Sequence, residues 1–141
     1  MKSNLQEYCL DLSNYKRLST RQVGVGDVLI GAENPIKVQS MTTPDTMDTQ
    51  GTIAQSIKMI DEGCELVRIT APSIKEAENL KNIRIGLRNK GYKTPLIADI
   101  HFTPNAAEIA ARIVEKVRIN PGNFADRKKF NYIEYTDDQY D

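Results

Sequence analysis

Charge of one sign is not in excess in this sequence, where 19 lysine and arginine residues balance 19 aspartate and glutamate residues. Nucleic-acid binders usually show a basic surplus, so the balance argues against that class while leaving room for a local anion site. Long apolar runs are also missing, and none approaches the roughly 18 residues that a membrane-spanning helix needs. Residues 1–17 lack the apolar core of a signal peptide. We therefore expect a soluble, cytoplasmic protein without nucleic-acid or membrane partners.

Cysteine is scarce. The two copies, Cys9 and Cys64, lie far apart and form no CxxC pair. Two isolated cysteines cannot by themselves supply the ligands of a zinc or an iron–sulfur site. We expect both to be reduced thiols with a structural role, and we expect no metal site within this chain.

Strand-like and helix-like segments alternate through the middle of the chain, which has the length of one ordinary domain at 141 residues. A hairpin is predicted within residues 21–31, with its turn at Gly26-Asp27. The spacing of apolar residues predicts strands at 35–41, 65–70, 95–100 and 116–120, and helices at 49–62, 73–90 and 105–114. Strands that alternate with helices indicate a parallel sheet with right-handed crossovers.

Helix boundaries carry their own signals. Ser73 and Glu76 match a capping box, and Thr103 followed by Pro104 matches an N-cap with proline at the first helical position. Gly63 and Gly91 are the expected stops of the two helices before them. Three regions follow: a polar extension at 1–20, a hairpin with four β/α steps at 21–123, and a charged segment at 124–141.

Polar side chains recur near the carboxyl ends of the four strands, all on one face. A doubly wound sheet would bury both faces under helices, whereas a (β/α)₈ barrel opens at the carboxyl ends of its strands into a site. The sequence therefore predicts the N-terminal half of a TIM barrel. The predicted pocket residues are Gln39, Arg68, Asp99, His101, Arg118 and Asn120.

The two arginines in this set indicate an anionic ligand, because a guanidinium fork matches phosphate oxygens. Asp99 could accept a hydrogen bond from a hydroxyl group, and His101 could donate to an oxyanion or transfer a proton. Simpler readings remain open at this point. The arginines could pair only with Asp99, His101 could be a hydrogen-bonded core residue, and Asn120 could bond its own turn.

Four motifs resemble one known family, the 4-hydroxy-3-methylbut-2-enyl diphosphate synthases. They are "IKVQSMTTPDT", "GCELVRIT", "PLIADIHF" and "VRINPGN", in the family's order within residues 21–123. The segment after "NPGN" resembles the longer, plant-like form of that family, which carries an inserted domain. The resemblance implies a TIM barrel and an oxidoreductase of isoprenoid biosynthesis in the methylerythritol phosphate pathway. The implied reaction is the reductive ring opening and dehydration of 2-C-methyl-D-erythritol 2,4-cyclodiphosphate.

The resemblance also implies roles for residues and partners. Arg68 and Arg118 match diphosphate-binding arginines, and Asp99 and His101 match the third-strand pair that we assign to catalysis. Asn120 matches the family's asparagine after the fourth-strand arginine. Gln39 is assigned to substrate binding from its place on the first strand, not from the resemblance. In the family a [4Fe–4S] cluster, held by three cysteines and a glutamate in a C-terminal domain, receives electrons from ferredoxin or flavodoxin. The chain offers no such ligand set.

We therefore expect a fragment that is inactive alone, with a homodimer as one assembly of the whole enzyme. Two alternatives stay open: another TIM-barrel enzyme with a diphosphate substrate, similar to pteroate synthase, and a non-catalytic phosphate-binding domain.

Overall fold

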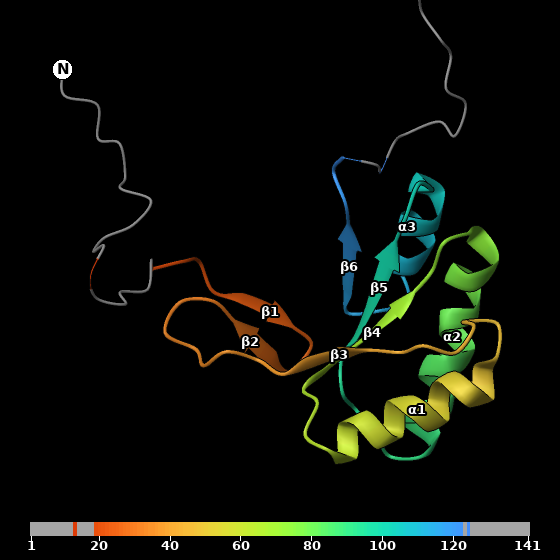
Figure 1. Cartoon of the computed structure of the whole chain (residues 1–141), viewed down its shortest axis with the longest axis horizontal. Helices are drawn as coiled ribbons and strands as arrows, with labels where there is room; N and C mark the ends of the chain where they lie inside the picture. The colour runs from red at the N-terminus through yellow and green to blue at the C-terminus, as the bar shows by residue number, and fades with distance from the viewer. Residues whose placement is uncertain (1–12, 14–18, 123, 125–141) are drawn as a thin grey trace, which may run out of the picture.

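The computed structural model describes residue 13, residues 19–122 and residue 124. An antiparallel hairpin of β1 (Val23–Val25) and β2 (Val28–Ile30) comes first. Strands and helices then alternate along the chain (Figure 1). They are β3 (Gln39–Met41), α1 (Thr49–Asp61), β4 (Leu66–Thr70), α2 (Ile74–Asn89), β5 (Leu96–Ile100), α3 (Pro104–Ala111) and β6 (Lys116–Ile119). The expected hairpin and the expected alternation are both confirmed.

The four later strands form one parallel sheet in the order β3-β4-β5-β6, the order of the chain. The helices lie on one side of this sheet and the hairpin on the other (Figure 1). Each crossover therefore returns on the same face, as it does in a barrel wall. All four strands consequently end at one edge, which we call the carboxyl edge.

The helix-covered face of the sheet holds the main core. Alternate residues of β4 and β5 are completely buried there, because a strand turns every second side chain to the same side. They pack against α2 and α3, and burial of each large side chain contributes about 1.5–3 kcal/mol. The fully buried members from the strands and helices are Val67, Ile69, Leu96, Ala98, Ile100, Leu80, Ile83, Leu87, Ala106 and Ala110.

The opposite face of the sheet is apolar only in its lower part. Leu66 and Ile97 are buried there against Val25 of the hairpin, with Val28 and Ile30 packed around them. The hairpin thus covers the face near the beginnings of the strands. The part near the carboxyl edge is left to polar side chains.

Helix starts follow the sequence signals only in part. Ser73 accepts a hydrogen bond from the Lys75 amide at 3.3 Å and donates to the Glu76 carboxylate. The expected capping pair is therefore present, but Ser73 bonds the amide of the second helical residue and not that of the third, which a standard capping box uses. Thr103 precedes Pro104 as expected, but its side chain does not cap α3. Its hydroxyl donates instead to the Pro72 carbonyl at 3.1 Å, which ties the α3 start to the loop before α2. That part of the prediction is wrong, because a partner in the neighbouring loop competes for the hydroxyl.

Gly63 and Gly91 end the first two helices, as predicted, with φ angles of +97° and +88°. The beginning of β3 differs from the prediction, since the strand starts at Gln39 and not at residue 35. The segment before it is held by Glu65, whose carboxylate accepts from the Val38 amide at 3.0 Å. The Val38 carbonyl in turn accepts from the Glu65 amide at 2.9 Å, so Val38 is tied to the start of β4 although it lies outside β3.

Ion pairs tie the beginnings of the strands together. Glu115 accepts from Arg88 at 3.1 Å and from the Leu96 amide at 2.8 Å. Arg88 also donates to the carbonyls of Tyr92 at 2.7 Å and Thr94 at 3.2 Å. The guanidinium therefore joins the end of α2 to the loops before β5 and β6.

Cys64 is a buried free thiol 2.9 Å from the Leu66 carbonyl, whereas Cys9 lies outside the described residues. The regions predicted at 1–20 and 124–141 also lie almost wholly outside the description. Among the helices that are described, none has the length and apolar character needed to cross a membrane.

Candidate functional site

One buried carboxylate organises the carboxyl edge of the sheet. Asp99 lies in β5, and its side chain is only 2% exposed. Its Oδ2 lies 2.5 Å from Nη2 of Arg68 on β4, and its Oδ1 lies 3.1 Å from Nη1 of Arg118 on β6. Nε2 of His101 is 3.3 Å from Oδ2. We call these four residues the Asp99 cluster.

Strand register explains why these residues meet. Asp99 pairs with Thr70 on one side and with Arg118 on the other, so the three occupy one row across the sheet. Arg68 pairs with Ile97 and therefore starts one row lower. Its long side chain reaches up toward the carboxyl edge to contact Asp99. The contact thus joins two rows of the same face.

The charges in the Asp99 cluster do not balance. One carboxylate faces two guanidinium groups, with an imidazole beside them. Each guanidinium gives only one of its terminal groups to Asp99, and the arginine side chains stay 25% and 37% exposed. Nε of Arg68 is buried without a hydrogen-bond partner in the described part of the chain. Spare donors and surplus positive charge suit a phosphate-type anion.

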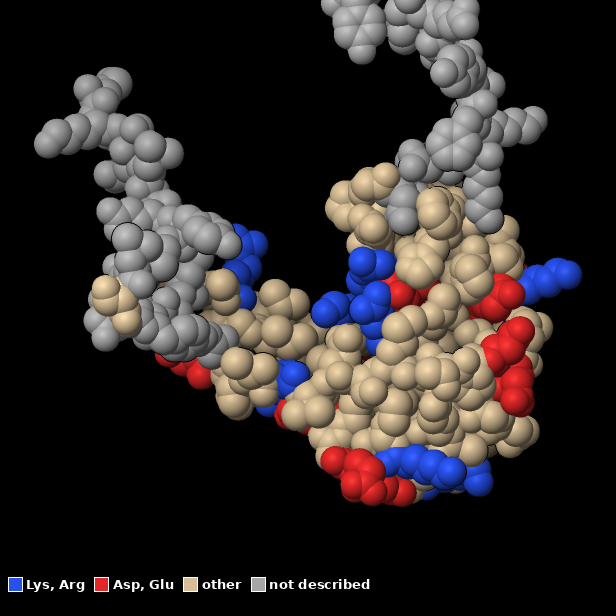
Figure 2. All heavy atoms as spheres, in the orientation of Figure 1, with Lys and Arg blue, Asp and Glu red and all other residues tan. Residues whose placement is uncertain are grey.

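Figure 2 shows basic atoms gathered beside acidic ones on the face of the strands that looks toward the hairpin. The same face carries Arg68 and Arg118, since both project away from the helix-covered core. A ligand could approach from this open side without moving a helix. The arrangement therefore combines an anchored pair of guanidinium forks with an accessible surface.

The two remaining predicted residues are placed differently. Asn120 directly follows β6, and its Oδ1 accepts from the Gly122 amide at 3.1 Å, as the turn-forming alternative expected. Gln39 is exposed at the start of β3 and pairs with Leu66, one row below Arg68. Four of the six predicted residues are thus in one contact network, while Asn120 serves its own turn and Gln39 lies lower.

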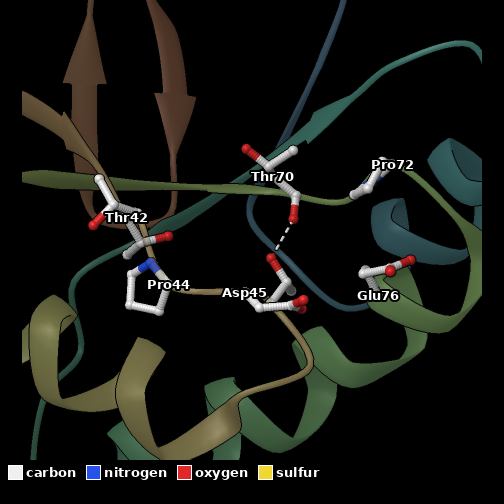
Figure 3. Close-up of a pocket in the computed structure, with 8 residues that line it drawn as sticks. Thr42, Pro44, Asp45, Thr70, Pro72 and Glu76 are labelled. Carbon is white, nitrogen blue, oxygen red and sulfur yellow. Dashed lines mark hydrogen bonds between the residues drawn. The ribbon is translucent and has the colours of Figure 1, made fainter.

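A hollow of about 280 Å³ opens beside the carboxyl ends of β3 and β4, and the sequence reasoning did not anticipate it. Figure 3 shows the β3–α1 loop on one side of it and the end of β4 on the other. Thr46 donates to the Thr70 carbonyl at 2.5 Å across this gap. The lining residues are Thr42, Thr43, Pro44, Asp45, Thr46, Thr70, Pro72 and Glu76. Its charged members are acidic, so an anion is better matched to the Asp99 cluster.

Glu76 at this hollow has its pKa lowered below the usual value of 4.5, chiefly because the Ser73 hydroxyl donates to it. The carboxylate therefore stays ionised at neutral pH. Its place in the first turn of α2 suits the positive end of the helix dipole. The local electrostatics here serve the start of the helix.

Comparison with known proteins places this chain in a family. Residues 20–139 match the GcpE TIM-barrel domain. A protein of Phocaeicola vulgatus is 52% identical over 93% of this chain and 22% of its own length. One of Bacteroides fragilis is 52% identical over 93% of the chain and 21% of its own length. One of Leptospira interrogans is 56% identical over 89% of the chain and 19% of its own length.

All three relatives bear the name 4-hydroxy-3-methylbut-2-en-1-yl diphosphate synthase (flavodoxin). The chain spans about a fifth of the length of these relatives. The match to the domain confirms the expected barrel fold, and the relatives confirm the expected family resemblance. With 120 of its residues inside the matched range of 20–139, the chain belongs to the GcpE TIM-barrel domain family.

Proposed function

We propose that this chain forms the substrate-binding N-terminal part of a 4-hydroxy-3-methylbut-2-enyl diphosphate synthase. The reaction opens the ring of 2-C-methyl-D-erythritol 2,4-cyclodiphosphate, releases water, and consumes two electrons and two protons. The observation that carries the proposal is the Asp99 cluster, with one arginine on each side of a buried carboxylate. The relatives' names give the diphosphate product and flavodoxin, and the cyclodiphosphate substrate is what the family resemblance implies.

Arg68 and Arg118 bind the diphosphate in this proposal. Their forks stand on the strands that flank β5, so two phosphate groups could be held side by side. When the carbon–oxygen bond of the ring breaks, charge develops on the released phosphate oxygen. Fixed guanidinium groups stabilise such charge without having to reorganise. Asn120 and Gln39 remain proposed substrate-binding residues.

Asp99 and His101 are the proposed catalytic pair, and their surroundings suggest a division of labour. Both oxygens of Asp99 face cationic groups, so its contribution is to fix the arginines and the imidazole. His101 has a 34% exposed side chain and stands at the open edge, where it could donate to a substrate oxygen or transfer a proton. It is thus the member of the pair that reaches the ligand.

The electrons require a group that the described residues do not fit. Those residues contain no set of three or more histidine, cysteine, aspartate and glutamate side chains that could hold a metal. Cys64, the cysteine among them, is buried at the opposite end of β4. We propose that a [4Fe–4S] cluster has its ligands elsewhere in the enzyme. Flavodoxin, which the relatives' names mention, is the proposed donor, with ferredoxin as the other candidate.

A chimaera tests the proposal. The matching segment of the Bacteroides fragilis relative is replaced by residues 20–139 of this chain, and the protein is purified without oxygen. We expect turnover of the cyclodiphosphate within about tenfold of the parent enzyme. A folded chimaera that keeps the parent's visible spectrum but gives no turnover would contradict the proposal. Binding of pyrophosphate without turnover would favour the non-catalytic phosphate-binding alternative.

A further inference from the structure

Phe102 has a backbone conformation that a bulky residue seldom adopts. It follows His101 directly after β5, and its φ angle is +56°. In the part of the chain that the structure describes, Ala32 is the other non-glycine residue with positive φ, at +49°. Glycine takes such angles without the steric cost that a Cβ atom brings. A bulky residue in this conformation is therefore a reason to ask what its side chain contacts.

The ring of Phe102 lies at the carboxyl edge of the sheet. It is 41% exposed and stands edge-on to the His101 ring, with 6.4 Å between the ring centres and 64° between the planes. His101 in turn lies 3.3 Å from Asp99. The turn at Phe102 therefore brings an apolar surface next to charged groups that hold an anion.

Strained backbone persists where the surrounding structure enforces it, and such residues gather at functional sites. Here the turn has two consequences at once. It ends β5 so that His101 stands at the open edge, and it leaves the phenylalanine ring beside that imidazole. An anion alone would need the arginines but not the ring. A ligand with a carbon portion would use both.

We propose that Phe102 is a specificity-determining residue whose ring contacts the carbon skeleton of a phosphorylated ligand. The arginines hold the phosphate groups, and the ring packs against the uncharged part. The inference rests on the proposed function, because it takes the Asp99 cluster as the anion site. It adds a contact for the carbon portion of that ligand, which the charged groups of the Asp99 cluster do not supply.

Two probes separate the roles of the arginines and the ring. Inorganic pyrophosphate carries the phosphates without carbon, and the cyclodiphosphate carries both. We would titrate each into the 141-residue chain and, in parallel, into the chimaera. Phe102→Gly should weaken cyclodiphosphate binding about tenfold, since part of a phenylalanine's burial is lost. The affinity of the same variant for pyrophosphate should change by less than about twofold, because this probe has no carbon portion for the ring to contact.

The matched control is Ala32→Gly, which relieves the same kind of backbone strain in the turn after the hairpin. It should leave the affinity for both probes unchanged. Phe102→Leu keeps an apolar side chain without the ring, so it should lose only part of the cyclodiphosphate affinity. This milder variant, placed in the chimaera, gives a result even if Phe102→Gly does not fold.

The outcomes distinguish the two proposals. Unchanged cyclodiphosphate affinity in the Phe102 variants, with pyrophosphate still bound, overturns the ring contact alone. An equal loss for both probes also overturns it, because the residue would then act only on the anion site. Failure of the wild-type chain and of the chimaera to bind pyrophosphate overturns the anion site, and the ring contact with it.

Discussion

The two ends of the parallel sheet carry the same kinds of charged residue, but these residues have different roles. Where the strands begin, Arg88 makes bonds to Glu115 and to the carbonyls of Tyr92 and Thr94. Where they finish, Arg68 and Arg118 share Asp99, and the Nε of Arg68 is buried without a partner in the described region. The donors of Arg88 hold loops together, whereas the terminal N–H groups that Arg68 and Arg118 do not give to Asp99 lie on partly exposed side chains and can bind a ligand. This division fits the general rule that barrel sites lie at the carboxyl ends of strands.

The largest effect should follow from removing the charge at the centre of the carboxyl edge. Asp99→Asn keeps the shape of the side chain but leaves two guanidinium groups without their counter-ion. We expect the free energy of unfolding to fall by about 3 kcal/mol, the lower range for breaking a buried ion pair, because both arginines are partly exposed. Urea unfolding of the chain measures this change.

Added pyrophosphate sharpens that experiment. It should restore part of the lost stability, since a bound anion replaces the missing charge and stabilises the folded state by mass action. Glu65→Gln is the control at the other end, where the carboxylate is paired with Lys37. This substitution should lower the free energy of unfolding much less, and added pyrophosphate should not restore any of the loss. Equal losses in both variants would remove the contrast between the two ends.

The next effect concerns the shape of the guanidinium groups. Arg68→Lys or Arg118→Lys keeps the charge but removes the fork. Hydrogen bonds to charged groups contribute about 1.5–3 kcal/mol, so kcat/KM of the chimaera should fall by about one to two orders of magnitude. The thermal midpoint, measured on the same preparations, should stay nearly constant. Lower stability with normal kinetics would mean that the arginines serve only the fold.

A smaller effect is expected at the beginning of the strands. Arg88→Ala removes bonds to two carbonyls and to Glu115, which should lower the free energy of unfolding by about 1–2 kcal/mol. Pyrophosphate affinity should not change, because this guanidinium lies at the end of the sheet away from the Asp99 cluster. Calorimetric titration of the variant checks both statements. Weakened binding in Arg88→Ala would show that the two ends are coupled.

The smallest effect is a pH dependence at the start of α2. The pKa of Glu76 is lowered from 4.5 in the folded chain, first by the Ser73 hydroxyl. A lowered folded-state pKa contributes stability above the unfolded pKa, and this contribution disappears as the pH falls through the folded value. Ser73→Ala should lower the free energy of unfolding by about 1 kcal/mol at pH 7, because α2 loses its N-cap side chain. The loss should shrink as the pH falls below 4.5 and through the lowered folded-state pKa, which urea unfolding at several pH values would reveal; a constant loss would contradict it.

Much of this fold could be predicted because each signal is local. Apolar spacing located α1, α2 and the buried strands, and Gly63 and Gly91 located two helix ends. The Asp99 cluster could also be predicted, since alternation along β4, β5 and β6 places Arg68, Asp99 and Arg118 on one face. Parallel strands then bring neighbouring rows together.

Most of the misses concern contacts between segments that are distant in sequence, and one of them, the cap of α1, is local. Thr103 bonds to Pro72, and Val38 is held by Glu65, so neither the cap of α3 nor the start of β3 follows from nearby residues. The row occupied by Gln39 depends on the register of β3 against β4, which alternation alone does not fix. Asp48 caps α1 by accepting from Gly51 at 2.9 Å, and the sequence reasoning overlooked it although aspartate is a common N-cap.

The central claim is that the carboxyl edge binds an anion through its two arginines. Nitrogen-15 NMR of arginine side chains tests it most directly, because the Nε–H groups of Arg68, Arg118 and Arg88 give separate signals. During a titration with inorganic pyrophosphate, we predict that the signals of Arg68 and Arg118 shift together and saturate while that of Arg88 stays fixed. Absence of a saturable shift at Arg68 and Arg118, or an equal shift at Arg88, would contradict the account.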